Sequence, residues 1–354
     1  MSGRRGAHEG SIYKSADGYW VGAASLGNGH RKVQGVPIST ERLTVAAFLS
    51  TWIVGARSTV RPSTWYRYSA LVRCHLIPQL GRTGLTKLRP ADCSSAFAAL
   101  AAKGLAPRTI IQVRAVLGRA LHEAEVDGLV TRNAARLARP PRVPHAEMRT
   151  LDASQARALI EAAKGERLGA LYALALASGA REGELLGLRW SDVDWDRGSI
   201  RISRTLLRVT GALSFGEPKT AHSRRTIPIG ASTIAALGRH RLSQAEERLH
   251  AGSAWADLDL VFSTELGTPI DAGNLLARTH YPLLERAGLP RLRFHDLRHT
   301  AATLLLEAGA HPRVVAERLG HASPSLVMNT YGHVTERMQK EATATLERVL
   351  ADDA

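Results

Sequence analysis

The spacing of apolar residues constrains the fold of this chain most, because it changes from a helical pattern to a strand pattern and back again. Between Pro107 and Asp127 the apolar side chains lie on one stripe of a helix, at Ile110, Val113, Val116, Leu117, Ala120, Leu121 and Ala124. Residues 199–209 (SIRISRTLLRV) and 224–229 (RRTIPI) instead have the composition of strands. Helical spacing returns after residue 230. We therefore predict a mainly α fold with a small antiparallel β-sheet, an α+β class.

The length of the chain predicts more than one domain. Its 354 residues exceed a single ordinary domain, so two or three are expected. Composition divides the chain into a strand-rich start, a helical segment, a proline-rich basic linker (RPPRVPHAEMR) and a large final unit. These four segments are residues 1–40, 43–138, 139–149 and 150–354.

Glycine and proline predict where individual elements begin and end. In the strand-rich start, turns are expected between three short strands, at residues 16–18 and 27–29. Three helices of the next segment are expected to begin with a proline in the first turn, at Pro62, Pro90 and Pro107. The helix that starts at Pro62 is expected to end before Pro78. Helices are also predicted over residues 154–164, 167–178 and 181–190, the second of them stopped by Gly179.

The charge balance indicates a polyanionic partner. Lysine and arginine number 47 against 32 acidic residues, a net charge of +15. A surplus of this size favours nucleic acid, because each phosphate contact releases counterions. The basic residues are spread over the whole chain, which favours folded domains with basic faces over a disordered arm. A ribosomal or generic basic protein is the alternative that charge alone leaves open.

Other features narrow the class of protein. Two cysteines, Cys74 and Cys93, are too few for a disulfide framework, and no Cys/His cluster suggests zinc. No stretch of about 18 apolar residues predicts a membrane span, and the first ten residues lack the apolar segment of a secretory signal. We therefore expect a protein of the reducing cytoplasm.

Five motifs in the final unit carry side chains suited to phosphoryl chemistry. The residues are Arg181 in SGAREGELLGLRW, Lys219 in EPKTAHSRR, His295 and Arg298 in RFHDLRHTAATLLLEAGA, His321 in ERLGHAS, and Tyr331 in TYGHV. Arginine forks hold phosphate oxygens and stabilise charge that builds up at phosphorus, and histidine exchanges protons near neutral pH. A phenol has a pKa of about 10 and must be activated to attack. Lys219 is the sole lysine from residue 165 to 339, so it is the only lysine available there as a cationic acid.

Each of these residues has a simpler interpretation when taken alone. Arg181 could only pair with Glu184 on its own helix, and a lysine in a turn is usually a solvated charge. His295 could be a residue at a helix start that Asp296 caps, and Arg298 a surface arginine beside a core stripe. His321 could be a cation at a helix end, and a lone tyrosine such as Tyr331 more often packs in a core. The set in this order is much more specific than any member.

At these motifs the sequence resembles the tyrosine recombinase family, and specifically the phage-type integrases. The blocks AREGELLGLRW, PKTAHSRRTIPI, FHDLRHTAATLLLEAG, RLGHAS and TYGHV follow the family's order and approximate spacing over residues 150–340. Residues 43–138 resemble the domain of that family that binds the core site, and residues 1–40 resemble the domain that binds arm sites. The resemblance implies a multidomain architecture that clamps DNA.

The resemblance also implies a role for each residue. Tyr331 would attack a DNA phosphate and form a 3′-phosphotyrosine, which frees a 5′-hydroxyl. Arg181 and Arg298 would clamp the phosphate, and Lys219 would protonate the leaving oxygen. His295 would accept the tyrosine proton or position it. His321 would hydrogen-bond a phosphate oxygen, and Glu184 would orient Arg181. The covalent link conserves the energy of the bond, so neither a metal nor another cofactor is expected.

Recombination joins two duplexes, so the resemblance implies a homotetramer on double-stranded attachment sites of a mobile element. An excisionase or a DNA-bending protein is a possible accessory. The end of the chain after Tyr331 fits an amphipathic helix along Met338, Ala342, Leu346 and Val349. This helix could pack on its own subunit or on a neighbour. Two other functions stay open at this point, namely a topoisomerase of the type IB chemistry and a DNA-binding regulator without catalysis.

Overall fold

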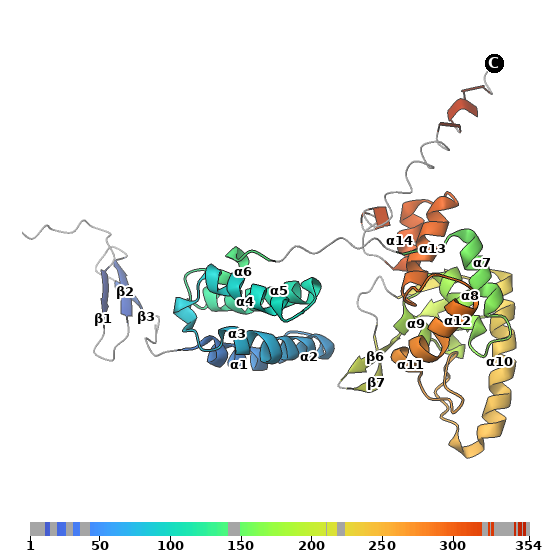
Figure 1. The fold of residues 1–354 in the computed structure, drawn as a ribbon, viewed down its shortest axis with the longest axis horizontal. Helices are drawn as coiled ribbons and strands as arrows, with labels where there is room; N and C mark the ends of the chain where they lie inside the picture. Colours follow the sequence, from blue (N-terminus) through green and yellow to red (C-terminus); the bar gives the residue numbers. More distant parts are fainter. Residues whose placement is uncertain are drawn as a thin grey trace, which may run out of the picture. The chain divides into compact units, whose positions relative to one another are not determined.

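The computed structural model describes residues 11–14, 20–25, 31–35, 43–140, 149–209, 211–217 and 224–320, with a few positions between 325 and 351. The chain divides into two compact units, Met1–His145 and Ala146–Ala354 (Figure 1). None of the described helices is long and apolar enough to cross a membrane.

The first unit begins with the three strands that the sequence predicts. They are β1 (Ser11–Lys14), β2 (Trp20–Ser25) and β3 (Arg31–Gly35). The strands form an antiparallel sheet in the order β1-β2-β3, with Ile12 opposite Gly22 and Ala23 opposite Val33. The two predicted turns lie outside the described residues.

The helices of the first unit enclose one apolar core. They are α1 (Val45–Gly55), α2 (Pro62–Leu71), α3 (Ile77–Leu80), α4 (Pro90–Ala102), α5 (Pro107–Val126) and α6 (Ala134–Leu137). The prolines predicted to start helices do begin α2, α4 and α5, where the missing N–H costs no intrahelical bond. The predicted stripe of α5 is buried along its length. A hydrogen bond from the Trp52 indole to Glu123, 2.7 Å long, joins α1 to α5.

The predicted end of the second helix before Pro78 is wrong. A π-helical turn, Val72–Leu76, continues α2 directly into α3, and Pro78 lies in the first turn of α3. The π turn shifts the bonding pattern by one residue just before Pro78. The missing N–H of that proline therefore falls where a new helical segment starts, and the chain continues without a break.

The second unit is built around a buried helix. Its helices are α7 (Ala153–Ala162), α8 (Gly169–Ser178), α9 (Glu182–Leu186), α10 (Ala231–Ala251), α11 (Ala272–Leu275), α12 (Tyr281–Arg286), α13 (Asp296–Glu307) and α14 (Pro312–Leu319). The apolar helix α8 packs against α7, α10 and α13, and α14 packs against α13 (Figure 1). The α7, α8 and α9 helices occupy the predicted regions, although α9 is shorter than expected.

The strand predicted over residues 199–209 is in fact two strands of different sheets. Strand β5 (Ser199–Ile202) lies between β4 (Val193–Asp194) and β8 (Arg225–Pro228), whereas β6 (Thr205–Val209) forms a separate two-stranded sheet with β7 (Ala212–Gly216). The chain leaves the first sheet at Arg204. Its Nε donates to the Gly187 carbonyl at 2.7 Å, and its guanidinium lies 4.1 Å from the Phe215 ring centre.

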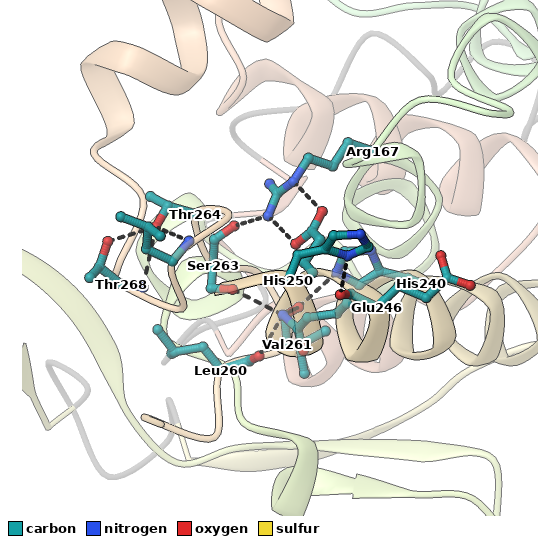
Figure 2. A network of polar contacts seen from close by, with 12 residues as sticks. Arg167, His240, Glu246, His250, Leu260, Val261, Ser263, Thr264 and Thr268 are labelled. Carbon is teal, nitrogen blue, oxygen red and sulfur yellow. Dashed lines mark hydrogen bonds and ion pairs between the residues drawn. The ribbon is translucent and has the colours of Figure 1, made fainter. Parts of the chain in front are cut away.

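A polar network holds α10 against the loop that follows it (Figure 2). Arg167 donates to both carboxylate oxygens of Glu247, at 2.6 and 2.7 Å, and to the carbonyl of Ser263. The buried Gln244 side chain donates to the carbonyls of Leu260 and Val261. Because these bonds satisfy polar groups away from water, they fix the position of the long helix beside α8.

Candidate active site

Arg181 lies at the junction between α8 and α9. Gly179 ends α8 in the left-handed conformation, with φ 61°, and Arg181 is the N-cap of α9. The Arg181 backbone N–H donates to Glu184 Oε2 at 3.0 Å, and its Nη1 donates to Glu184 Oε1 at 2.7 Å. A side chain three residues into the helix therefore holds both the backbone and the guanidinium of Arg181.

Two glycines let α9 approach strand β6 closely. A Cβ on Gly183 would lie 2.6 Å from the Leu206 carbonyl oxygen, and one on Gly187 would lie 3.0 Å from the Leu206 nitrogen. At Gly183 a Cβ would force the backbone apart, and at Gly187 it would make a tighter contact than is usual, so glycine suits both positions. The motif EGELLG therefore fixes the position of α9, and with it Arg181 and Glu184, against the β6–β7 hairpin.

Arg298 lies on α13 and joins the segments that precede two other predicted site residues. Its side chain is buried, with 4% exposure. Nη1 donates to the Gly179 carbonyl at 2.8 Å, and Nη2 donates to the Leu319 carbonyl at 2.7 Å. Gly179 comes two residues before Arg181, and Leu319 comes two residues before His321. The surface arginine interpretation of Arg298 is therefore wrong.

His295 immediately precedes α13 and lies about one helical turn before Arg298. Its ring packs edge-on to that of His299, with ring centres 5.4 Å apart. Loss of solvation, followed by the positive charges of His299 and Arg298, lowers the pKa of His295 to about 4. His295 is exposed, and because its pKa is lowered it is neutral at neutral pH and can accept a proton.

The expected cap at Asp296 is wrong. Asp296 is the first residue of α13, and its carboxylate accepts from the backbone N–H of Arg293 at 2.8 Å and from the Arg293 side chain. The carboxylate thus stabilises the turn that enters the helix. That turn presents His295 at the helix start.

Arg225 also contacts this site, although it is not among the site residues predicted from the sequence. Its Nη2 donates to Glu184 Oε2 at 2.9 Å, and its Nε donates to the Arg318 carbonyl at 2.6 Å. Arg318 in turn donates to the carbonyls of Ala177 and Pro228. The dipeptide Arg224–Arg225 in the motif SRRTIPI was the available signal. Sequence alone could not separate the buried arginine from the exposed one.

The structure thus brings part of the predicted set together. Arg181 and Glu184 are in contact, and Arg298 is linked to them through the end of α8. His295 lies at the start of the helix that carries Arg298. Lys219, His321 and Tyr331 lie outside the described residues. So does most of the predicted C-terminal helix, of which Leu346 is described and exposed.

The described part of the site is suited to binding an anion. Its charged side chains include Arg181 and Arg225, which both bind the Glu184 carboxylate, and Arg298, which binds the carbonyls of Gly179 and Leu319. Burial opposes ionisation of Glu184, but Arg225 and then Arg181 keep its pKa below the ordinary value. Within the described ranges, no group of three His, Cys, Asp or Glu side chains could hold a metal ion.

Comparisons with known proteins identify the family. The model of the phage integrase family matches residues 149–338, and that of the phage integrase N-terminal SAM-like domain matches residues 44–99. A XerC-like tyrosine recombinase of Caldanaerobacter subterraneus subsp. tengcongensis is 33% identical over 332 residues, which cover 88% of this chain and 85% of that protein. An integrase of Saccharopolyspora erythraea is 27% identical and covers 95% of each chain.

Solved structures share the fold. The integrase of transposon Tn1549, in complex with a circular intermediate DNA, has a TM-score of 0.73 at 23% identity, over 87% of this chain and 99% of that chain. A lambda integrase dimer bound to a COC′ core site has a TM-score of 0.60 at 18% identity, over 82% of this chain and 95% of that chain. Together with the family matches, these findings show that the chain belongs to the phage integrase family and is a site-specific recombinase of the tyrosine type.

Proposed function

We propose that this recombinase cuts and rejoins double-stranded DNA at the attachment sites of a mobile element through a 3′-phosphotyrosine at Tyr331. One observation carries the proposal at the level of residues: buried Arg298 binds the carbonyls of Gly179 and Leu319. It thereby ties together the chain segments that lead to Arg181 and to His321. This convergence is what a site around one phosphorus atom requires.

The proposed cleavage step uses each residue once. The Tyr331 oxygen attacks the phosphorus as its proton passes to His295, and the bond from phosphorus to the 5′-oxygen breaks. Lys219 gives a proton to that leaving oxygen. Arg181 and Arg298 stabilise the charge on the non-bridging oxygens, and His321 donates to one of them. Rejoining is the reverse reaction with a 5′-hydroxyl from another strand.

The properties of the described residues support these roles. His295 is neutral at neutral pH, as a proton acceptor must be, and a bound phosphate anion would raise its pKa toward neutrality. Glu184 keeps the Arg181 guanidinium in place, which limits the motion lost when a phosphate binds.

The remaining parts of the chain are assigned by likeness to the family. We assign residues 1–40 to arm sites, 43–138 to the core site, 139–149 to a linker and 150–354 to catalysis. The lambda integrase is known as a tetramer bound to a Holliday junction, and we propose the same assembly here, in a bacterial cytoplasm. An excisionase or DNA-bending partner is part of this proposal.

A covalent-trapping assay tests the chemistry. The substrate is a DNA duplex that contains the attachment site flanking the gene and carries a nick beside the cleavage position. We expect a protein–DNA adduct that forms in the presence of EDTA and is absent from Tyr331→Phe. An adduct that persists in Tyr331→Phe would refute the nucleophile. Relaxation of supercoils without joint products would indicate a topoisomerase, and binding without an adduct would indicate a regulator.

A further inference from the structure

We propose that Arg225 is a positioning residue for strand cleavage, which acts through Glu184 on the Arg181 guanidinium. The inference rests on the proposed function of the site. It adds a residue to which the cleavage chemistry itself assigns no role.

The contacts of Arg225 connect three elements of the site. From strand β8 its guanidinium reaches Glu184 on α9, with Nη2 2.9 Å from Oε2, and the carbonyl of Arg318 on α14, with Nε 2.6 Å from that oxygen. The side chains of Arg225 and Glu184 are 7% and 3% exposed. An arginine fork that satisfies two buried acceptors in fixed directions determines the distance between the elements that carry them.

Glu184 transmits this position to Arg181. Its Oε2 accepts from both Arg225 and the Arg181 backbone, while its Oε1 accepts from Arg181 Nη1 at 2.7 Å. The carboxylate therefore lies between the two arginines. If Arg225 is removed, Glu184 can rotate or shift, and the Arg181 guanidinium shifts with it.

The charge of Glu184 also depends on Arg225. Among the described residues, the charged groups that face this carboxylate are Arg181 from its own helix start and Arg225 from β8. From α14, Arg318 presents its carbonyl to Arg225 and directs its guanidinium to the carbonyls of Ala177 and Pro228. Burial raises the pKa of Glu184, and Arg225 is the strongest of the influences that lower it.

Loss of Arg225 should therefore raise the pKa of Glu184, because the burial remains while its principal countercharge disappears. Because Glu184 is a carboxyl group, a raised pKa means that it is protonated, and therefore neutral, at a higher pH. In Arg225→Met, Glu184 takes up a proton as the pH falls through a range in which the wild-type carboxylate stays ionised. A protonated Glu184 holds Arg181 less well, so cleavage by the variant should slow toward lower pH more steeply than cleavage by the wild type.

The neighbouring arginine provides a matched control. Arg224 is 58% exposed and pairs with Glu217, which is 81% exposed. Arg224→Met removes the same charge from the position just before Arg225 and leaves the ion pair between Arg225 and Glu184 in place. Any effect of net charge on DNA affinity is therefore common to both variants, and a positioning effect belongs to Arg225 alone.

The experiment measures single-turnover adduct formation by the full chain on the nicked substrate, with DNA affinity and thermal unfolding measured in parallel. We expect Arg225→Met to slow adduct formation about 100-fold at saturating DNA, as a displaced catalytic group does. Arg224→Met should stay near the wild-type rate, and Arg225→Lys should recover part of the loss. In a Glu184→Gln background, Arg225→Met should slow the reaction only a fewfold further, because its route to Arg181 is already lost.

The outcomes separate the two proposals. A wild-type chain that forms no adduct, or an adduct in Tyr331→Phe, refutes the proposed function. If the wild type forms its adduct and Arg225→Met forms it at the same rate and with the same pH profile, the role of Arg225 is refuted. Equal losses in the wild-type and Glu184→Gln backgrounds would also refute action through Glu184. If Arg225→Met unfolds, Arg225→Lys decides by its pH profile and its coupling to Glu184→Gln.

Discussion

Replacement of Gly179 by alanine should weaken both the fold and the active site, since this glycine has two separate reasons to lack a side chain. Its φ of 61° lies in the left-handed region, where a residue with a Cβ costs about 1–2 kcal/mol more than glycine. A Cβ at this position would also lie 2.5 Å from Leu319 Cδ2. Leu319 is fully buried, and forcing extra volume into such packing costs about 1–3 kcal/mol.

The sum is a destabilisation of about 2–5 kcal/mol. Gly288 is a matched control, because its φ of 64° is nearly the same while nothing lies within 4 Å of its Cβ position. Gly288→Ala should therefore cost only the conformational part, about 1–2 kcal/mol. Hydrogen exchange of the amides of α8 and α13 reports the opening free energy of this unit apart from the rest of the chain.

Catalysis should separate the two variants further. The carbonyls of Gly179 and Leu319 both anchor Arg298, so a shift between these residues displaces the guanidinium. We expect adduct formation to slow in Gly179→Ala and to stay near the wild-type rate in Gly288→Ala. Equal stabilities for the two variants would refute the packing argument, and equal cleavage rates would refute the role of these carbonyls as anchors.

Further predictions concern other residues of the two units. Lys219→Ala should slow cleavage greatly, and a substrate with a 5′-bridging thiolate leaving group should recover much of the rate; without recovery, Lys219 is not the acid. Arg298→Lys should lower the cleavage rate about 100-fold or more, because an ammonium cannot replace the planar fork, and a near-normal rate would contradict this. The pKa of His295 is lowered to about 4, whereas the same histidine in the unfolded chain takes up its proton at about pH 6.5. The free energy of unfolding should therefore fall as the pH drops from about 6.5 toward about 4. Unfolding measured over this pH range should show a smaller fall in that free energy for His295→Gln. Glu123→Met removes the acceptor of the Trp52 indole bond and should cost the first unit about 1 kcal/mol, measured by urea unfolding, and no change would make that bond negligible.

Much of the site was predictable because its signals are local. Gly179 ends α8 in the conformation that glycine adopts without strain, and Arg181 follows within the cap of the next helix. Pro62, Pro90 and Pro107 begin helices because their fixed φ and missing N–H suit the first turn. The motif order over the final unit was enough to predict the family.

The break at Arg204 and the identity of the buried arginine were not predictable in this way. Residues 199–209 carry no glycine or proline, so nothing local ends the first strand; the break depends on Gly187 and Phe215, which Arg204 meets only after folding. Arg224 and Arg225 are chemically identical, and only strand β8 decides which of them faces Glu184.

The sequence by itself therefore determined the class of fold, the starts of α2, α4 and α5, the end of α8 and the chemistry of the motifs, since backbone preferences and residue types act within a few positions. The tertiary structure alone decided that buried Arg298 joins the carbonyls of Gly179 and Leu319 and that Arg225 binds Glu184. The bonds concerned join residues 119 and 41 positions apart. A choice of partner over such separations is made by packing and desolvation of the whole unit, and no short stretch of residues encodes it.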